Sequence, residues 1–200
     1  MPSSEDVRIR PSALRPVTPD PTAAADDALA ARALEGDHDA LAALLSRHDL
    51  LLRRLAWALL RDARAMEELL AQVYCRAALG LASARDGATV RTWLARLTWQ
   101  ACVDATRPRW RRGTARARGT TSTATAHHGA GAGVDAGSDG PLAAALAELP
   151  ADQRAVVLLV DAEGFGVDEA AWVLDVPAAT AGELLVRARS SLRPGARGRA

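Results

Sequence analysis

The chain has 200 residues, with 25 basic and 24 acidic side chains and a formal net charge of +1. This length suggests one or two modest domains, and the near neutrality excludes a uniformly basic protein that coats nucleic acid. Every basic residue is Arg and none is Lys, a bias that we attribute mainly to genome-wide codon usage. The basic charge therefore has to be located along the chain before it says anything about function.

Membrane, secreted and metal-binding classes find no support in the sequence. The longest aliphatic run covers residues 155–160, which is far below the ~20 residues of a membrane span. The N-terminus lacks the apolar segment of a signal peptide, and Cys75 and Cys102 form no metal-site or disulfide pattern. We expect a cytoplasmic protein with no membrane contact, no metal and no cofactor. No Ser/His/Asp or Cys/His set indicates an enzyme, so we expect no small-molecule substrate.

Composition divides the chain into five parts. Residues 1–25 are Pro-rich and aperiodic, which predicts a disordered tail. In residues 113–140, Gly, Ala, Thr and Ser fill 21 of 28 positions, which predicts a flexible linker. Two compact segments remain, residues 26–112 and 141–193, and a basic tail of residues 194–200 follows the second.

Hydrophobic spacing predicts helices in the first compact segment. Capping and turn residues set their ends. The expected helices run from caps at Asp26 and Asp27 to Gly36, from His38 through Leu59, from Asp62 to near Gly80, and from Val90 through Ala101.

The second compact segment ends in a helix-turn-helix pattern. Pro141 and Pro150 each suit the start of a helix, and Gly164–Gly166 breaks the helix that Pro150 opens. A short helix over residues 167–174, a tight turn and a longer helix over residues 178–192 then follow. No stretch alternates like a strand, so the predicted class is all-α.

Basic charge gathers at the end of the first compact segment. Residues 26–118 carry a net charge of +5, and six of their Arg lie within residues 107–118, around a Trp. Arg interleaved with Trp is typical of single-strand binding, since Arg neutralises phosphates and aromatic rings stack on bases. The alternative is a solvated basic helix end, and Trp93 also fits an apolar helix stripe. The candidates for single-strand binding are Trp93, Trp99, Arg107, Arg109, Trp110, Arg111 and Arg112.

The helix-turn-helix segment has the opposite charge. Residues 141–192 hold three Arg and eight acidic residues, a net charge of −5. A recognition helix normally directs polar and basic side chains from its first turns into the major groove. Here those turns begin with Ala178, Ala179 and Thr180 and continue to Glu183. These residues provide few side chains that could contact bases.

Two motif blocks then carry a resemblance. The first is VRTWLARLTWQACVDATR, and the second is LAELPADQRAVVLLVDAEGFGVDEAAWVLDVPAATAGELLVRARSSLR. In this order and spacing they resemble the extracytoplasmic-function (ECF) RNA polymerase sigma factors of the sigma-70 family. The resemblance implies a four-helix sigma domain two, a flexible linker and a helix-turn-helix sigma domain four with a degenerate recognition helix.

The resemblance also implies a bacterial transcription initiation subunit whose partners are core RNA polymerase and promoter DNA. The first domain would bind core polymerase and melt the −10 element, and the second would contact the −35 element. Elements about 17 base pairs apart span ~58 Å, and a linker of 28 residues reaches ~90 Å. The sequence leaves undecided whether an anti-sigma factor is a further partner.

Family positions map onto three sets of residues. The polymerase-binding set is Glu67, Glu68, Leu69 and Gln72, with Ala71 where the family usually has Gln. Trp99 and Gln100 stand where the −10 helix of the family has Arg and Asn. The recognition-helix set is Ala178, Ala179, Thr180, Glu183, Arg187 and Arg189, and the two basic residues usual in its first turns are missing.

These departures leave an alternative function open. A sigma-like helix-turn-helix regulator that has lost promoter reading would act through protein contacts alone. The acidic helix-turn-helix segment and the replaced Gln of the polymerase-binding helix motivate this alternative.

Overall fold

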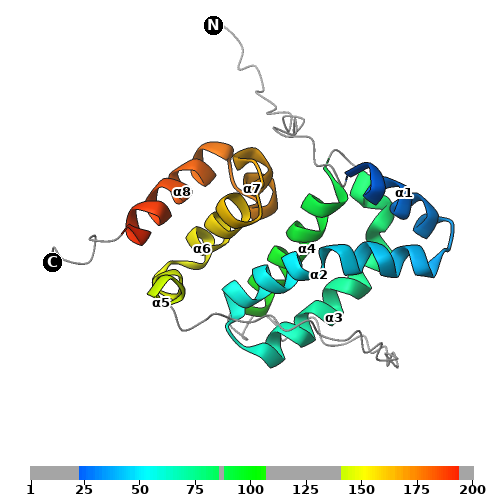
Figure 1. The fold of residues 1–200 in the computed structure, drawn as a ribbon, viewed down its shortest axis with the longest axis horizontal. Coiled ribbons are helices and arrows are strands. Elements are labelled where there is room, and N and C mark those ends of the chain that lie inside the picture. Colours follow the sequence, from blue (N-terminus) through cyan, green and yellow to red (C-terminus); the bar gives the residue numbers. More distant parts are fainter. Residues whose placement is uncertain (1–22, 86–87, 107–140, 194–200) are drawn as a thin grey trace, which may run out of the picture.

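The computed structural model describes residues 23–85, 88–106 and 141–193, and within them every regular element is helical. The predicted all-α class is therefore confirmed. Figure 1 shows two groups of helices side by side, α1–α4 and α5–α8. The predicted linker, most of the predicted N-terminal tail, the C-terminal tail and the Arg-rich residues 107–112 lie outside the described residues.

The first group contains the four predicted helices and one short addition. Its elements are α1 (Ala23–Leu34), α2 (His38–Leu60), α3 (Ala63–Gly80), the 3-10 helix η1 (Leu81–Arg85) and α4 (Val90–Thr106). Asp37 caps α2 by accepting from the Ala40 N–H at 2.9 Å. Asp62 caps α3 through the Ala65 N–H at 2.9 Å, so the predicted start of this helix is confirmed.

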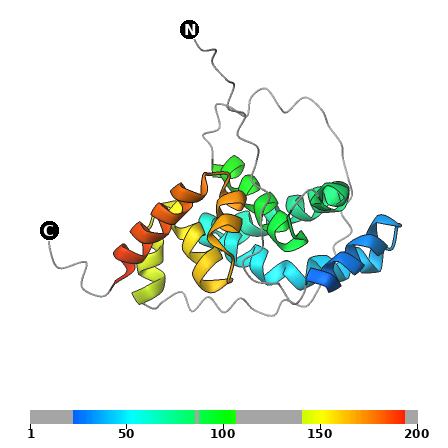
Figure 2. The same ribbon diagram turned by 90° about the horizontal axis from the view of Figure 1, so that it is seen from above.

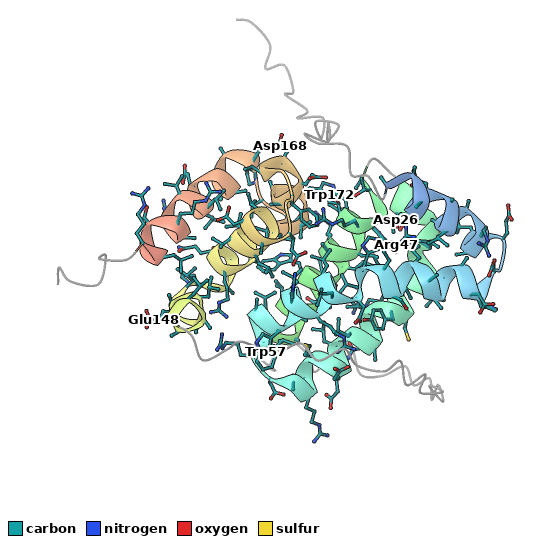
Figure 3. All side chains as sticks on the ribbon, in the orientation of Figure 1. Asp26, Arg47, Trp57, Glu148, Asp168 and Trp172 are labelled. Carbon is teal, nitrogen blue, oxygen red and sulfur yellow. The ribbon has the colours of Figure 1, made fainter. Side chains whose placement is uncertain are left out.

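Asp26 does not cap α1, and that prediction was wrong. The helix begins at Ala23, inside the predicted tail, and the Asp26 side chain is only 2% exposed. One carboxylate oxygen accepts from Arg47 Nη1 at 2.7 Å, and the other lies 2.8 Å from His48 Nε2. A buried carboxylate requires such partners, and Figure 3 shows Asp26 and Arg47 together where α1 meets α2.

The core of the first group is aliphatic. Helices α2, α3 and α4 contact one another and enclose Leu52, Leu55, Leu70 and Leu94, each at most 1% exposed. Helix α1 packs against α2 and α4 and covers one side of this core. Burial of these side chains supplies most of the drive to assemble the group, because each removes a large apolar surface from water.

The second group is a chain of short helices with tight corners. Its elements are α5 (Pro141–Glu148), α6 (Ala151–Val157), the π-helical turn η3 (Leu158–Ala162), α7 (Val167–Leu174) and α8 (Ala178–Leu192). Helices α7 and α8 match the predicted helix-turn-helix, whereas the π-helical turn was not predicted. Gly164 at φ +73° and Asp175 at φ +60° provide the left-handed residues before and after α7.

Arg154 joins the two groups through backbone carbonyls. Its guanidinium donates to the carbonyls of Leu146 at 2.8 Å, Ala147 at 3.0 Å and Leu149 at 2.7 Å, and also to the carbonyl of Ala58. These carbonyls lie at the C-terminal ends of α5 and α2, where the helix dipole favours a cation. Burial lowers the pKa of Arg154 from its usual value, and this cost is offset by the four acceptors.

The two groups pack against each other along two pairs of helices. Helix α4 contacts α7, and α2 contacts α6, as Figures 1 and 2 show from perpendicular directions. One hydrophobic core runs continuously through both groups. None of the described helices combines the length and apolarity that crossing a membrane requires.

Candidate functional site

The exposed face of α3 carries three of the four predicted polymerase-binding residues. Glu67, Glu68 and Gln72 are exposed, but Leu69 is only 4% exposed and lies in the core. Leu69 therefore fixes how α3 packs, and its neighbours provide the surface. The same face continues to Leu79, which is 90% exposed.

A polar network orients Glu67. Arg53 on α2 donates to Glu67 and also to Asp49 at 2.8 Å, while the Tyr74 hydroxyl donates to Asp49. The two carboxylates hold the pKa of Arg53 well above its usual range, and burial followed by Asp49 raises the pKa of Tyr74. Glu68, in contrast, pairs with Arg64 alone among the described residues, at 3.0 Å, and both side chains are largely exposed. Both glutamates are thus accessible, and the first is also held in place by its partners.

The predicted single-strand-binding residues on α4 differ in how far they are buried. Trp93 is 7% exposed, and a Cβ at Gly80 would lie 3.4 Å from its ring, so Trp93 fills the corner where α3 ends. Trp99 is half-buried and Gln100 is exposed, one turn after Arg96. The other predicted residues, Arg107, Arg109, Trp110, Arg111 and Arg112, lie outside the described part of the chain.

The recognition helix α8 exposes small side chains in its first turn, and its basic side chains are paired with acidic ones. Ala178 and Ala179 are exposed in the first turn, and Thr180 is half-buried. Glu183 lies 3.5 Å from Arg187, with both side chains about two-thirds exposed. Arg189 donates to both carboxylate oxygens of Asp161 on η3, one of them at 3.1 Å.

The predicted recognition residues thus lie on one helix, and both of its basic side chains already have acidic partners inside the second group. Exposed Val186 lies between the two ion pairs of α8. Among the described residues no set of three His, Cys, Asp or Glu side chains could hold a metal ion.

Sequence reasoning missed the residues between the two groups. Arg54, Arg91 and Arg96 of the first group meet Glu163 and Asp175 of the second across 72 to 109 residues of chain. No local spacing signals such pairs, because the partners belong to helices that are adjacent only after folding.

Comparisons with known proteins cover both groups. The family model "Sigma-70, region 4" matches residues 140–192. The curated relatives include two proteins named ECF RNA polymerase sigma factor SigM, from the H37Rv and Erdman strains of Mycobacterium tuberculosis. The first is 32% identical over 167 residues, which cover 84% of this chain and 82% of the relative. The second is 32% identical over 164 residues, with 82% and 81% covered.

Solved structures share the fold. CnrH in complex with the cytosolic domain of CnrY matches with a TM-score of 0.60 and 24% identity, covering 84% of this chain and 94% of that chain. The sigma factor RpoE in complex with the anti-sigma factor NepR from Bartonella quintana matches with a TM-score of 0.55 and 24% identity, covering 74% and 91%. Both sets of matches span the two groups of helices.

Proposed function

This chain belongs to the ECF RNA polymerase sigma factors, which bind core RNA polymerase and direct it to promoters, and we propose a division of this work between its two modules. In this proposal the N-terminal module, residues 26–112, binds polymerase and opens the −10 element. The C-terminal module, residues 141–193, contacts the −35 element, and residues 113–140 connect the two. The observation that carries the proposal is the 32% identity to sigma factors across both modules.

The polymerase contact in this proposal is the exposed face of α3. Glu67 is held by Arg53, so it meets a partner with little loss of side-chain freedom. Glu68 and Gln72 lie beside it and are accessible. Ala71 gives this face a smaller side chain than the family residue, so we assign recognition to the three polar residues.

The −10 contact involves Trp99 and Gln100 on α4 together with the Arg and Trp residues that follow the helix. Gln100 is exposed and offers both a donor and an acceptor to an unpaired base. Arg107, Arg109, Arg111 and Arg112 would neutralise phosphates, and Trp110 would stack. The −35 contact uses Ala178, Ala179, Thr180, Glu183, Arg187 and Arg189 of α8.

The test of the polymerase surface is a binding titration of the full chain with purified core polymerase. Glu68→Ala combined with Gln72→Ala should weaken binding roughly tenfold, because the double substitution removes two exposed side chains from the same contact surface. Glu35→Ala, an exposed acidic residue after α1, is the matched control. Unchanged binding by the double variant would remove α3 from the proposal.

The test of promoter contact is transcription from genomic fragments with the reconstituted holoenzyme, followed by footprinting at the promoters found. Glu183→Arg should tighten the −35 contact, since the present side chain repels phosphate and reduces the charge of α8. Glu148→Arg on exposed α5 adds the same charge elsewhere. A footprint without any −35 protection, in both the parent and Glu183→Arg, would exclude a DNA-reading role for α8.

The family likeness does not favour the alternative of a regulator that acts without promoters. The two structural neighbours were solved with the cytosolic domain of CnrY and with the anti-sigma factor NepR. We therefore include an anti-sigma factor among the partners to be sought for this chain. A pull-down with this chain that recovers neither core polymerase nor a smaller regulatory protein would contradict this part of the proposal.

A further inference from the structure

Helix α8 turns one face into the C-terminal module and leaves the opposite face open. Its buried residues are Ala181, Leu185 and Ala188, and the helix packs against α6 and α7. Glu183 lies two residues from each of the first two, which places it on the opposite face of the helix. Arg187 follows one turn later and meets Glu183 at 3.5 Å, with both side chains 67% exposed. The outward face therefore carries a carboxylate and a guanidinium side by side.

The two arginines of α8 differ in how much of their guanidinium is left for a ligand. Arg189 donates to both carboxylate oxygens of Asp161 on η3, so its planar fork is already filled and holds α8 on the π-helical turn. Within the described part of the chain, the guanidinium of Arg187 contacts Glu183 alone, at 3.5 Å, which is the limit of a hydrogen bond. The fork of Arg187 is therefore open to a ligand that offers two neighbouring acceptors.

A glycine inside α8 is not explained by the packing of the helix. Gly182 directly precedes Glu183, and a Cβ added at Gly182 would meet no atom within 4 Å outside its own stretch of helix. Glycine in a helix interior lowers stability relative to alanine, so the fold gains nothing from the missing side chain. Glycine is the residue used where a ligand or another backbone must come close to the chain. Gly182 thus marks a point of close approach beside the exposed ion pair.

A carboxylate beside an open guanidinium fork is complementary to one kind of base pair. In the major groove a G·C pair presents two neighbouring acceptors, guanine N7 and O6, and then a donor, the cytosine amino group. An A·T pair presents its donor between its two acceptors, so a fork finds no neighbouring acceptors there. The fork of Arg187 suits guanine, and the carboxylate of Glu183 suits the amino group of the paired cytosine.

We propose that Glu183 and Arg187 together read one G·C pair of the −35 element, and that Gly182 lets the DNA backbone approach α8 closely enough for both to reach it. This inference rests on the proposed function, because it names the base pair that the −35 contact selects. Ala178 and Ala179 are exposed in the first turn, so no long side chain there keeps the helix away from the groove. Glu183 reduces the attraction of α8 to phosphates, and it makes the remaining contact selective.

The first experiment selects promoters with the holoenzyme, reconstituted from core polymerase and the full chain. The −35 element of a promoter found among genomic fragments is randomised, and the DNA that the holoenzyme binds is sequenced. The parent should favour G·C over the other pairs at one position by about tenfold or more. Glu183→Ala and Arg187→Ala should each remove this preference, and the double variant should remove no more. Glu183→Arg, which tightens the contact to phosphate, should also lose the preference.

A matched control distinguishes base reading from a general effect of charge. Glu148→Ala removes an exposed acidic side chain from α5 and leaves α8 unchanged, so its selected sequences should equal those of the parent. Far-UV circular dichroism checks that each variant is folded. A parent without a preferred G·C position would overturn the proposal, and so would a preference that survives both single substitutions. A parent holoenzyme that selects no promoter at all would instead contradict the proposed function.

The second experiment replaces single atoms of the selected base pair. Holoenzyme binding is measured on promoter DNA that carries 7-deazaguanine, which lacks N7, or inosine, which keeps both N7 and O6. With 7-deazaguanine the parent should bind about three to ten times more weakly, because one arm of the guanidinium fork loses its acceptor. Inosine should leave binding nearly unchanged, and Arg187→Ala should respond to neither base. Equal responses of the parent and Arg187→Ala to 7-deazaguanine would overturn the assignment.

The third experiment separates a binding role of Gly182 from a structural one. Gly182→Ala should raise the urea midpoint of the free chain, because alanine favours the helix and its Cβ meets open space. The same variant should bind promoters roughly threefold or more weakly for every −35 sequence, since contacts to the DNA backbone position the helix without reading bases. A glycine with only a structural role would not move stability and binding in opposite directions. Unchanged or tighter promoter binding would overturn the close approach.

Discussion

The two sides of α4 are built from different chemistry, although they belong to one helix of 17 residues. One side buries Leu94 and Ala101 in the core of the N-terminal module. The other holds Arg91 and Arg96 against carbonyls, rings and a carboxylate of the C-terminal module. Water cannot replace an apolar contact without cost, but it exchanges readily with hydrogen bonds. We call the first the core side of α4 and the second its module-facing side.

The largest expected effect is on the core side. Leu94→Ala should lower the free energy of unfolding by about 2–5 kcal/mol, because the side chain is fully buried and a cavity remains. Urea unfolding measures the change. Leu79→Ala, at a position 90% exposed, should change the free energy by less than about 0.5 kcal/mol. Similar losses in the two variants would contradict the assignment of Leu94 to the core.

The second-largest loss of stability is expected for Arg154, at the junction between the modules. Arg154→Met should cost about 1–3 kcal/mol, because it leaves buried carbonyls at the end of α5 without their donor. Hydrogen exchange of the α5 amides should accelerate along with the loss of stability. Arg187→Met, on the exposed face of α8, should leave both measurements unchanged. Unaltered exchange in Arg154→Met would show that α5 is held by other contacts.

Arginines on the module-facing side should contribute less to stability. Arg96→Ala should change the free energy of unfolding by about 1 kcal/mol or less, because its carboxylate partner is exposed and water replaces the lost hydrogen bonds. Urea unfolding measures the change, and Arg76→Ala on exposed α3 is the control. A loss as large as that of Leu94→Ala would show that the two sides of α4 do not differ.

A further difference on α4 can be measured without any substitution. At pH 8 a thiol reagent should modify Cys75 rapidly and Cys102 at least about a hundredfold more slowly, since Cys75 is exposed and Cys102 is buried on α4. Burial also raises the pKa of Cys102 to about 12, so its reactive thiolate is scarce at this pH. Mass spectrometry follows each site. Equal rates would mean that the core side of α4 opens as readily as an exposed helix face.

The raised thiol pKa also predicts a pH dependence. The contribution of buried, protonated Cys102 is fully present below the usual thiol pKa of about 8.5. It is lost as pH rises toward about 12, because the unfolded chain releases this proton first. Unfolding titrations of the parent and Cys102→Ala between these values should converge as the pH increases.

Local features of the fold could be predicted from the sequence. The helix bounds 167–174 and 178–192 agree with α7 and α8, because Gly166 and Pro177 mark their starts in the sequence itself. The start of α3 at Asp62 follows from a hydrogen bond between residues three apart. These features depend on neighbours in the chain, so pattern reasoning reaches them.

Distant partners could not be predicted in this way. Asp26 was assigned to a cap, but its partners Arg47 and His48 lie 21 and 22 residues further along the chain. The burial of Leu69 and Trp93, both predicted to contact partners, likewise depends on how the helices pack together. The position of Glu163 depends on an unpredicted π-helical turn and on Arg54, which is 109 residues away.

The Arg154 guanidinium has a consequence for the order of assembly. Three of its acceptors lie five to eight residues away, and the fourth, on Ala58, lies 96 residues away. Closing a loop of a few residues takes ~10–100 ns, whereas a long loop costs more entropy and closes later. The α5–α6 corner can therefore form first and act as a rigid unit. The fourth hydrogen bond, to Ala58, then joins this unit to the N-terminal module.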